Sequence, residues 1–484
     1  MSEIIDHKCG IVLAYTLHDA YNMMAELQHR GREAAGIAAI GPDRIDVLKW
    51  IGRVRDFDRG DLHRIFPGKE YHVFMGHVRY ATKGRKNPQE ILFDAHPHVI
   101  GGTVINHGAH QLILNCEMAM VHNGQVDVSS LEQIVKENLR TGCDTEALLQ
   151  YYAEVGEREL VRTVPGSYTL IIADQKKRDV MVIRDPSGNR PGFIGRKGEK
   201  HCAASESIAI FKNGGTSISD LVPGTIYYFD PHGFIEDKPL FPPSTLREKK
   251  AHCMFEFLYL AHPDSVIDGV SVHAFRTFLG EELAKECSDL NVDIITYVPR
   301  SPEIAAASFA RASGIPAVDV FYKTDGQRSF MGLTQDERQK AIDSNLYLIP
   351  SAIEQIRGKK VAVIEDSIVR GTVARRVRDL LIIEAGVAEA TLCSYTPPIG
   401  IIGDDHIARG CEYGVDMPST DKFIARIVDA DGKPNRNATV DEISQKAGMS
   451  VRYLSTLGLA RVFEKVGLPF SGMCSYCIGG KKPF

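Results

Sequence analysis

The segment VAVIEDSIVRGTVARR, residues 361–376, constrains the fold of this chain more than any other part of its sequence. A short run rich in β-branched residues ends in two carboxylates, Glu365 and Asp366. The loop 367–372 then supplies two hydroxyls and one glycine before a helical pattern begins. This order is typical of a strand that delivers its acids to the carboxyl edge of a parallel sheet, where open α/β sheets bind ligands.

Such a loop is suited to a phosphate group. Successive backbone N–H groups and the dipole of the following helix can face an anion, and the carboxylates can take ribose hydroxyls or a hydrated Mg²⁺. An acidic strand end before an ordinary turn is the alternative interpretation. The strict order of strand, acid pair, hydroxyl, glycine and hydroxyl favours the phosphate site.

The pattern of the chain changes near residue 250. From residue 10 to residue 237 it is rich in hairpin-like strand pairs, including 167–174 with 179–185, and helices are expected at 18–30 and 130–140. Prolines and charges in 237–252 indicate a segment that crosses between domains. After it, strands alternate with helices in the manner of a parallel α/β domain. We therefore predict a leader at 1–8, an α+β domain at 9–245, an α/β domain at 246–440 and a helical tail at 441–484.

Composition excludes several classes of protein. The chain has 484 residues, 44% apolar and 25% charged, which is ordinary for a globular protein of two or three domains. A net charge of −5 provides no general positive field for nucleic acid or an anionic membrane. No apolar run is long enough to span a bilayer, and MSEIIDHK has no apolar signal core, so a cytoplasmic protein is expected. Walker A, HExxH, GxSxG and dinucleotide GxGxxG motifs are missing from the sequence.

Two sets of motifs resemble known families. Residues 361–376 resemble the motif that binds phosphoribosyl diphosphate (PRPP) in type I phosphoribosyltransferases. In the first part of the chain, five segments follow in the order seen in class II glutamine amidotransferases: CGIV (9–12), LQHRGREAAGI (27–37), GHVRYAT (76–82), VHNGQ (121–125) and GCDTE (142–146). Together they resemble the glutamine PRPP amidotransferases over most of 9–484. Asparagine synthetase and glucosamine phosphate synthase share the first domain, but they need an ATP-pyrophosphatase loop or a sugar isomerase.

This resemblance implies both a fold and a reaction. The fold is an αββα N-terminal nucleophile glutaminase domain followed by an α/β type I phosphoribosyltransferase domain. The first domain would release ammonia from glutamine, and the second would pass it to PRPP, giving 5-phosphoribosylamine and pyrophosphate, the first committed step of purine nucleotide synthesis. Feedback nucleotides and a homo-oligomer, a dimer or tetramer, are also implied. A non-catalytic PRPP-sensing regulator and a glutaminase that feeds another acceptor are the rival hypotheses.

Cys9 is the nucleophile that the resemblance implies. In isolation, a cysteine in an apolar strand is more often a small core residue. In the family, its free α-amine accepts the thiol proton, so nucleophile and base belong to one residue. That chemistry requires the removal of residues 1–8. Asn123 and Gly124 would present donors to the oxyanion of the tetrahedral intermediate.

The resemblance also assigns the substrate sites. Arg79 suits the α-carboxylate of glutamine and Asp144 its α-ammonium, and Arg30 and Thr82 complete the glutamine site. PRPP would be bound by Glu365, Asp366, Ser367, Ile368, Val369, Arg370, Gly371 and Thr372, and Mg²⁺ by Ser301, Glu365 and Asp366.

Some positions depart from the family pattern. The acid pair is Glu-Asp where the family usually has Asp-Asp. The predicted pyrophosphate loop, VPRSPE, carries Arg300 in place of an acid and Pro302, which has no N–H to donate. The loop KTDGQRSF at 323–330 is short and lacks bulky tip residues. These differences indicate a divergent branch with altered pyrophosphate contacts.

Cysteine spacing predicts one further site. Cys474 and Cys477 form a C-x₂-C pair, for which zinc, a redox dithiol and coincidence all remain open. The iron–sulfur branch of the family adds Cys253 and Cys411, and this resemblance favours a 4Fe-4S cluster over zinc. Ordinary thiols are expected at the other positions, Cys116, Cys143, Cys202, Cys287 and Cys393.

Overall fold

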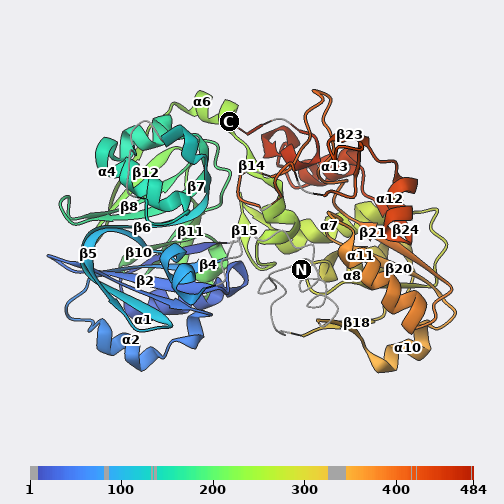
Figure 1. Ribbon diagram of the computed structural model, residues 1–484, viewed down its shortest axis with the longest axis horizontal. Helices are drawn as coiled ribbons and strands as arrows, with labels where there is room; N and C mark the ends of the chain where they lie inside the picture. The colour runs from blue at the N-terminus through green and yellow to red at the C-terminus, as the bar shows by residue number, and fades with distance from the viewer. Residues whose placement is uncertain are drawn as a thin grey trace.

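The computed structural model folds the chain into two lobes, which Figure 1 shows side by side. It describes residues 9–80, 87–131, 135, 139–324, 345–411, 413–415, 417–420, 422–480 and 482–483. The predicted leader at 1–8, Thr82 and residues 325–330 of the loop 323–330 lie outside these residues. None of the helices described in these ranges has the length and hydropathy of a membrane span.

Within the described ranges, thirteen antiparallel strands form the framework of the first lobe. They are β1 (Gly10–Ala14), β2 (Ala34–Ile40), β3 (Ile45–Ile51), β4 (Val73–Arg79), β5 (His98–Asn106), β6 (His110–Val126), β7 (Gly166–Asp174), β8 (Asp179–Arg184), β9 (Phe193–Lys197), β10 (Lys200–Ala204), β11 (Thr216–Asp220), β12 (Thr225–Asp230) and β13 (Gly233–Pro239). Their order is β11-β9-β10-β1-β4-β2-β3-β6-β7-β8-β12-β13, with β5 paired to β6. The hairpin predicted at 167–174 with 179–185 is confirmed as β7 with β8, and a second hairpin joins β12 to β13.

These strands make two facing layers because β6 runs from one layer into the other. Its first part pairs with β3 and its last part with β7. Ile11 and Leu13 of β1 share a core with Ile171 of β7, so the two layers bury apolar side chains between them. Val12 points the other way, toward the core that includes the first helix. Burial on both faces explains why these strands read as nearly continuous apolar runs.

Helices cover the outer faces of both layers. The helices of this lobe are α1 (Leu17–Glu26), α2 (Arg59–Ile65), α3 (Pro88–Asp94), α4 (Asp144–Thr163), α5 (Ser207–Lys212) and α6 (Pro243–Lys249). Helix α1 begins where the Thr16 hydroxyl accepts the backbone N–H of Asp19, and it turns Ala20 and Met24 into the core. Helix α4 covers the opposite face through Leu148 and Tyr152. The resulting order of helix, sheet, sheet and helix is the αββα architecture that the family resemblance implies.

A parallel sheet forms the second lobe. Its strands are β17 (Ile294–Tyr297), β20 (Lys360–Glu365), β21 (Glu389–Ser394) and β24 (Ser450–Tyr453), and they stand in that order. Helices surround the sheet: α7 (Val272–Glu286), α8 (Glu303–Ser313), α10 (Pro350–Ile356), α11 (Thr372–Arg378), α12 (Val440–Ala447) and α13 (Thr456–Lys465). The parallel α/β pattern expected after residue 250 is therefore confirmed.

The short strands of the second lobe come in pairs. Strand β14 (His252–Cys253) pairs with β25 (Met473–Cys474), β15 (Val266–Ile267) with β16 (Val270–Ser271), β18 (Phe321–Lys323) with β19 (Leu346–Leu348), and β22 (Arg426–Val428) with β23 (Pro434–Asn437). The tail 441–484 contributes α12 and α13, and also β24, which the sequence pattern did not predict. The predicted boundary between residues 245 and 246 falls inside α6.

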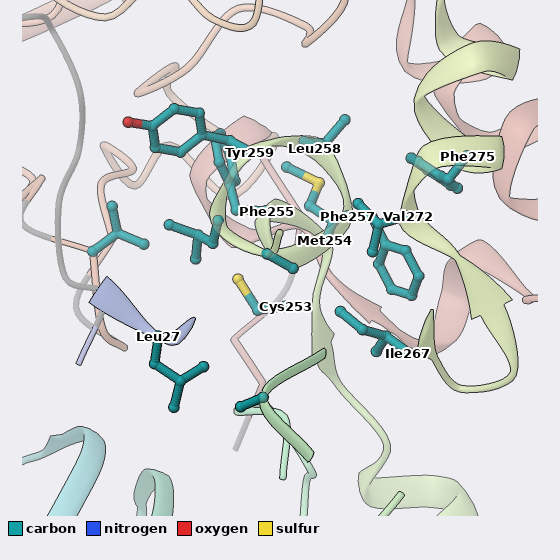
Figure 2. Packing of buried hydrophobic residues seen from close by; sticks show 14 of the residues in the cluster. Leu27, Cys253, Met254, Phe255, Phe257, Leu258, Tyr259, Ile267, Val272 and Phe275 are labelled. Carbon is teal, nitrogen blue, oxygen red and sulfur yellow. The ribbon is translucent and has the colours of Figure 1, made fainter. Parts of the chain in front are cut away.

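One apolar core joins the two lobes around a π-helical turn at Glu256–Leu260. Figure 2 shows Phe257 of this turn beside Phe275, with Leu27 of the first lobe near Cys253. The ring centroids of Phe257 and Phe275 are 5.1 Å apart, and Phe463 packs edge-on against Phe257 at 5.6 Å. Helices α7 and α13 therefore pack against the π-helical turn, which also faces the first lobe.

Candidate functional sites at Cys9 and at the Glu365–Thr372 loop

Cys9 directly precedes β1, which lies between β4 and β10. Its carbonyl accepts a hydrogen bond from Arg30 Nε at 3.0 Å. Burial raises the pKa of the Cys9 thiol, although a hydrogen bond with the Tyr80 backbone and the nearby guanidinium group of Arg79 act against it. The thiol is therefore protonated at neutral pH and needs a base before it can act as a nucleophile.

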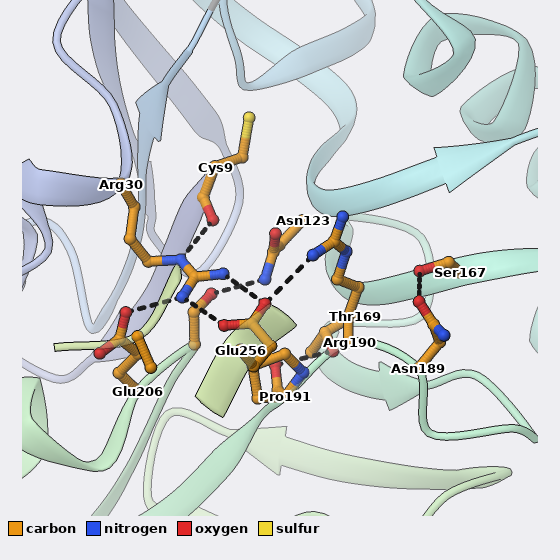
Figure 3. Close-up of polar contacts among 12 residues, drawn as sticks. Cys9, Arg30, Asn123, Ser167, Thr169, Asn189, Arg190, Pro191, Glu206 and Glu256 are labelled. Carbon is orange, nitrogen blue, oxygen red and sulfur yellow. Dashed lines mark hydrogen bonds and ion pairs between the residues drawn. The ribbon is translucent and has the colours of Figure 1, made fainter. Parts of the chain in front are cut away.

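Arg30 belongs to a buried ion-pair network that Figure 3 shows next to Cys9. Its Nη1 donates to Glu206 at 2.6 Å and to Glu256 at 3.0 Å, and its Nη2 donates to Glu256 at 3.0 Å. Arg190 Nη1 donates to the same Glu256 carboxylate at 3.1 Å. Glu256 lies on the π-helical turn of the second lobe, so a chain of charged hydrogen bonds connects that turn to the backbone of Cys9. Sequence reasoning did not predict Arg190, Glu206 or Glu256, because no local motif marks them.

Asn123 and Gly124 lie on β6, opposite β7. The Asn123 side-chain amide donates to Ser205 Oγ at 3.3 Å, and this oxygen also accepts the N–H of Ile11 at 3.0 Å, two residues from Cys9. Gly124 has φ +153°, and a Cβ built there would meet the Ser167 carbonyl oxygen at 1.8 Å. The close approach of the β6 backbone to Ser167 on β7 therefore requires glycine at this position.

The predicted glutamine ligands Arg79 and Asp144 lie at the ends of two elements, β4 and α4. Arg79 closes β4 and donates to Glu33 at 2.8 Å and to Asp94 at 3.4 Å. Asp144 begins α4 and accepts the Val126 N–H at 3.0 Å. Arg79 lowers and Asp144 raises the pKa of the Cys9 thiol, so both charges lie within electrostatic reach of the nucleophile.

Four buried histidines form a cluster behind this site, and sequence reasoning missed them. His77 and His96 stack with ring centroids 4.0 Å apart, and His98 meets His96 edge-on at 4.8 Å. Burial lowers the pKa of His77 to about 3 and holds the pKa values of His96 and His98 well below the ordinary value. His122 also has a lowered pKa, mainly from burial. The tripeptide His96-Pro97-His98 is the sequence feature that could have indicated this histidine cluster.

The loop after β20 has the form that the sequence predicts. Glu365 and Asp366 are 7% and 8% exposed at the carboxyl edge of the parallel sheet. The Ser367 hydroxyl donates to Asp366 Oδ1 at 2.9 Å, and Ile368 and Val369 anchor the loop in the core. Beyond Arg370, the chain turns into α11 at Thr372.

Gly371 makes the turn between the loop and α11. It has φ +75°, in the left-handed region that favours glycine, and a Cβ there would meet Ile424 Cδ1 at 2.5 Å. Both its conformation and its close packing therefore require glycine at this position. The turn directs the N-terminus of α11 toward the same edge as the two acids.

Ser301 and Arg300 lie in the neighbouring loop of the same sheet edge. Strand β17 pairs in parallel with β20, and the Val298 N–H donates to the Ile364 carbonyl at 3.2 Å. The loop then passes Ser301 and enters α8 at Glu303. Both predicted phosphate loops thus leave adjacent parallel strands on the same side.

The predicted cluster ligands Cys253, Cys411, Cys474 and Cys477 come together from separate segments. Strands β14 and β25 place Cys253 and Cys474 opposite each other. The pKa of the Cys477 thiol is raised well above its ordinary value by burial and by the nearby Cys411, Cys474 and Cys253. Two backbone hydrogen bonds hold the segments that carry these cysteines. The Cys411 N–H donates to the Met417 carbonyl at 2.6 Å, and the Gly400 N–H donates to the Cys477 carbonyl at 2.8 Å.

The chain is similar to known proteins over its whole length. A glutamine amidotransferase domain model matches residues 99–238. Amidophosphoribosyltransferase of Bacillus subtilis is 30% identical over 99% of this chain and 94% of that protein. The corresponding protein of Methanothermobacter thermautotrophicus is 32% identical over 100% of this chain and 95% of its own length.

Solved structures give the same result. Glutamine PRPP amidotransferase from B. subtilis, complexed with ADP and GMP, has a TM-score of 0.77 and 27% identity, covering 98% of this chain and 97% of that one. The matches span both lobes and therefore both candidate sites. With this full-length similarity, the chain belongs to the amidophosphoribosyltransferase family of glutamine-dependent phosphoribosyltransferases.

Proposed function

We propose that the Cys9 site hydrolyses glutamine and that the 365–372 loop binds the PRPP to which the ammonia is transferred. The products are 5-phosphoribosylamine, glutamate and pyrophosphate, and the step begins purine nucleotide synthesis. One observation carries the assignment of the two half-sites: a partly buried cysteine directly before β1 and an acid-and-glycine phosphate loop after β20 occur in one chain of this family. The intact site residues of both lobes favour an enzyme over a PRPP-sensing regulator.

At the first site, Cys9 is the nucleophile. Its α-amine, freed by removal of residues 1–8, takes the thiol proton, and the sulfur attacks the side-chain amide carbon of glutamine. The oxyanion that forms is stabilised by donors at Asn123 and Gly124, a contribution of about 3 to 4 kcal/mol for one such donor. The C–N bond then breaks as the α-ammonium of Cys9 gives its proton to the departing nitrogen, so that ammonia leaves. Water hydrolyses the thioester to glutamate and restores the Cys9 thiol. Arg30 acts as a positioning residue, because its Nε holds the Cys9 carbonyl.

Glutamine is bound by its charged ends. Arg79 takes the α-carboxylate and Asp144 the α-ammonium, with Arg30 and Thr82 completing the site. Arg79 is paired with Glu33 and Asp94 in this structure, so its guanidinium is held at the edge of β4 with a fixed orientation. The α-carboxylate of glutamine would bind this guanidinium in place of one of the two carboxylates.

At the second site, the loop from Ser367 to Thr372 holds the 5-phosphate of PRPP, and Glu365 and Asp366 hold the ribose hydroxyls. Mg²⁺ would be held by Ser301, Glu365 and Asp366, and it would neutralise charge on the departing pyrophosphate. Buried carboxylates at a sheet edge fit this hard cation. Arg300 adds positive charge beside the pyrophosphate position.

A 4Fe-4S cluster is proposed at Cys253, Cys411, Cys474 and Cys477. The thiols of Cys411, Cys474 and Cys253 all act on the pKa of the buried Cys477 thiol, so the four cysteines share one buried site. Four cysteine ligands match the four corners of such a cluster, and the family resemblance favours this assignment over zinc. The cluster would join β14 to the C-terminal segment and stabilise the second lobe.

Regulation and assembly are proposed from the relatives. The B. subtilis structure carries ADP and GMP, and we propose nucleotide feedback and a cytoplasmic homo-oligomer for this chain as well. No nucleic-acid or membrane partner is proposed, given the net charge of −5.

Assaying glutamate and pyrophosphate together tests the proposal. Purified protein is incubated with glutamine, PRPP and Mg²⁺, and the enzyme should form both products in equal amounts. Glutamate without pyrophosphate would indicate a glutaminase serving another acceptor, and neither product would indicate a regulator. Cys9→Ala should abolish the glutamine-dependent reaction, whereas ammonia at high pH should still support it. Equal loss of both reactions would contradict the separate sites.

Intact-mass measurement tests the nucleophile mechanism. Active protein should begin at Cys9, because a neutral amide at this position is no base. Unprocessed protein should have glutaminase activity lower by about 10²-fold to 10⁴-fold, the range for loss of a general base. Full glutaminase activity in protein that retains residues 1–8 would refute the role of the α-amine.

A further inference from the structure

Three potential metal donors converge beside the Cys9 site, outside the residues used above. His98 is the first residue of β5, His96 lies two residues before it, and Cys143 is the N-cap residue of α4. One ring nitrogen of each histidine and the Cys143 sulfur all lie within 4.8 Å of one another. Both histidines are 4% exposed. The topology, and not a local motif, brings these donors together.

Each imidazole is already held by one nitrogen and has its other nitrogen available. His96 Nε2 forms a hydrogen bond with Thr145 Oγ1 at 2.8 Å, and within the described ranges its buried Nδ1 has no hydrogen-bond partner. His98 bonds to the Asp94 backbone, and its buried Nε2 likewise has no partner among the residues that the structure describes. Metal-binding histidines almost always have this arrangement, in which an outer partner fixes the tautomer and aims the free lone pair at the metal.

Unsatisfied buried nitrogens are costly. A buried polar atom without a partner costs about 1 to 3 kcal/mol, and within the described ranges each of the two imidazoles beside the Cys143 thiol carries one such nitrogen. A metal ion bound between the three residues would give the imidazoles a partner. The donor set of two imidazoles and one thiolate matches Zn²⁺, whereas Mg²⁺ and Ca²⁺ require oxygen ligands.

We propose that His96, His98 and Cys143 bind one Zn²⁺ ion, with a water molecule as the fourth ligand. Cys143 thus becomes a metal ligand in place of the ordinary thiol predicted from the sequence. This inference does not depend on the proposed reaction, since none of the three donors has a role in it, although the Cys143 thiol donates to Asp144 at 3.7 Å.

The site would fix the element that carries Asp144. Cys143 directly precedes Asp144 in the chain, and Thr145 Oγ1 donates to Asp144 Oδ1 at 3.4 Å while it also bonds to His96. The ion would therefore tie the start of α4 to the start of β5, and its role would be structural. Loss of zinc should loosen this corner of the first lobe and leave the parallel sheet of the second unaffected.

Metal analysis of the full chain tests the proposal. Protein purified from zinc-supplemented medium without chelators should contain one equivalent of zinc more than His98→Gln and one more than Cys143→Ser. His201→Gln, on β10 of the same lobe, is the matched control and should retain this equivalent. Cys477→Ser should retain it too, which separates this site from the cysteine cluster. Equal zinc in the wild type and both ligand variants would overturn the proposal.

Spectroscopy provides a second test, and its X-ray absorption measurement uses the wild type alone and so does not rely on the variants folding. After exchange with Co²⁺, a thiolate-to-cobalt charge-transfer band should appear, and Cys143→Ser should weaken it. X-ray absorption at the zinc edge of the native protein should show a shell with both nitrogen and sulfur neighbours. A shell made only of sulfur, or only of oxygen, would contradict a site built from His96, His98 and Cys143.

Discussion

Glu256→Gln tests whether the buried ion-pair network couples the two lobes. Glu256 is 2% exposed and accepts bonds from Arg30 at two oxygens and from Arg190 at one, at 3.0 to 3.1 Å. Burial alone would raise the pKa of Glu256, but the two arginines outweigh it and lower the pKa below its ordinary value. The carboxylate is therefore ionised at neutral pH, and the substitution removes a real charge.

The expected loss of stability is large. Glutamine has the same shape as glutamate but no charge. The buried guanidinium groups of Arg30 and Arg190 would each lose one anionic partner, and the glutamine N–H₂ would point at one of them. Breaking a buried ion pair in this way costs about 3 to 5 kcal/mol. With a shift of about 2 to 4 °C per kcal/mol for domains of 150 to 250 residues, Tm should fall by about 6 to 20 °C. Arg30 retains Glu206, which keeps the loss within this range.

Calorimetry and two activity assays measure the effect. Glu442→Gln is the control, because Glu442 also forms a two-pronged pair, with Arg436, but on the surface, and this variant should unfold at nearly the wild-type temperature. Glutamine-dependent activity should fall more than ammonia-dependent activity in Glu256→Gln, since Arg30 holds the Cys9 carbonyl. If both variants had the same Tm and the same ratio of activities, the coupling argument would be refuted.

Three further predictions concern the individual sites. Gly124→Ala should abolish glutaminase activity while ammonia-dependent transfer survives, because its Cβ would lie 1.8 Å from the Ser167 carbonyl oxygen; Gly198→Ala, at φ +59° with open space around it, is the control and should retain activity. Asp366→Asn should raise the KM for PRPP by about ten- to 150-fold, from the loss of one charged hydrogen bond of about 1.5 to 3 kcal/mol, and unchanged PRPP kinetics would contradict the phosphate-loop assignment. Anaerobically purified protein should contain iron and inorganic sulfide in equal amounts and Cys477→Ser should contain less of both; stoichiometric zinc without iron would exclude the cluster.

Local patterns predicted the elements of this fold well. The strand, acid pair and glycine of 361–376 form β20, the loop and α11, because each depends on neighbours within a few residues. The helix at 18–30 appears as α1 followed by a short 3₁₀ turn, since Thr16 caps it and its apolar residues share one face. Part of the predicted helix at 130–140 lies outside the described residues, and the part described begins with a 3₁₀ turn at Val128–Leu131.

Motifs also located the chemical groups but not their partners. Arg30 was expected at the glutamine site from its motif, and the structure adds that Glu206 and Glu256 hold its guanidinium. A glutamate 226 positions away cannot be inferred from spacing. The role of Arg30 toward glutamine itself stays a prediction.

What the amino-acid sequence determined by itself is thus the set of strands, helices and site motifs, because periodicity, capping and turn chemistry act over short distances along the chain. Only the tertiary structure decided which buried polar groups meet: the arginines with Glu256, the four cysteines with one another, and His96 and His98 with Cys143. The physical reason is that a buried charge or imidazole must find its partner inside the folded protein, and that partner is selected by the packing of sheets and helices, whatever its distance in sequence.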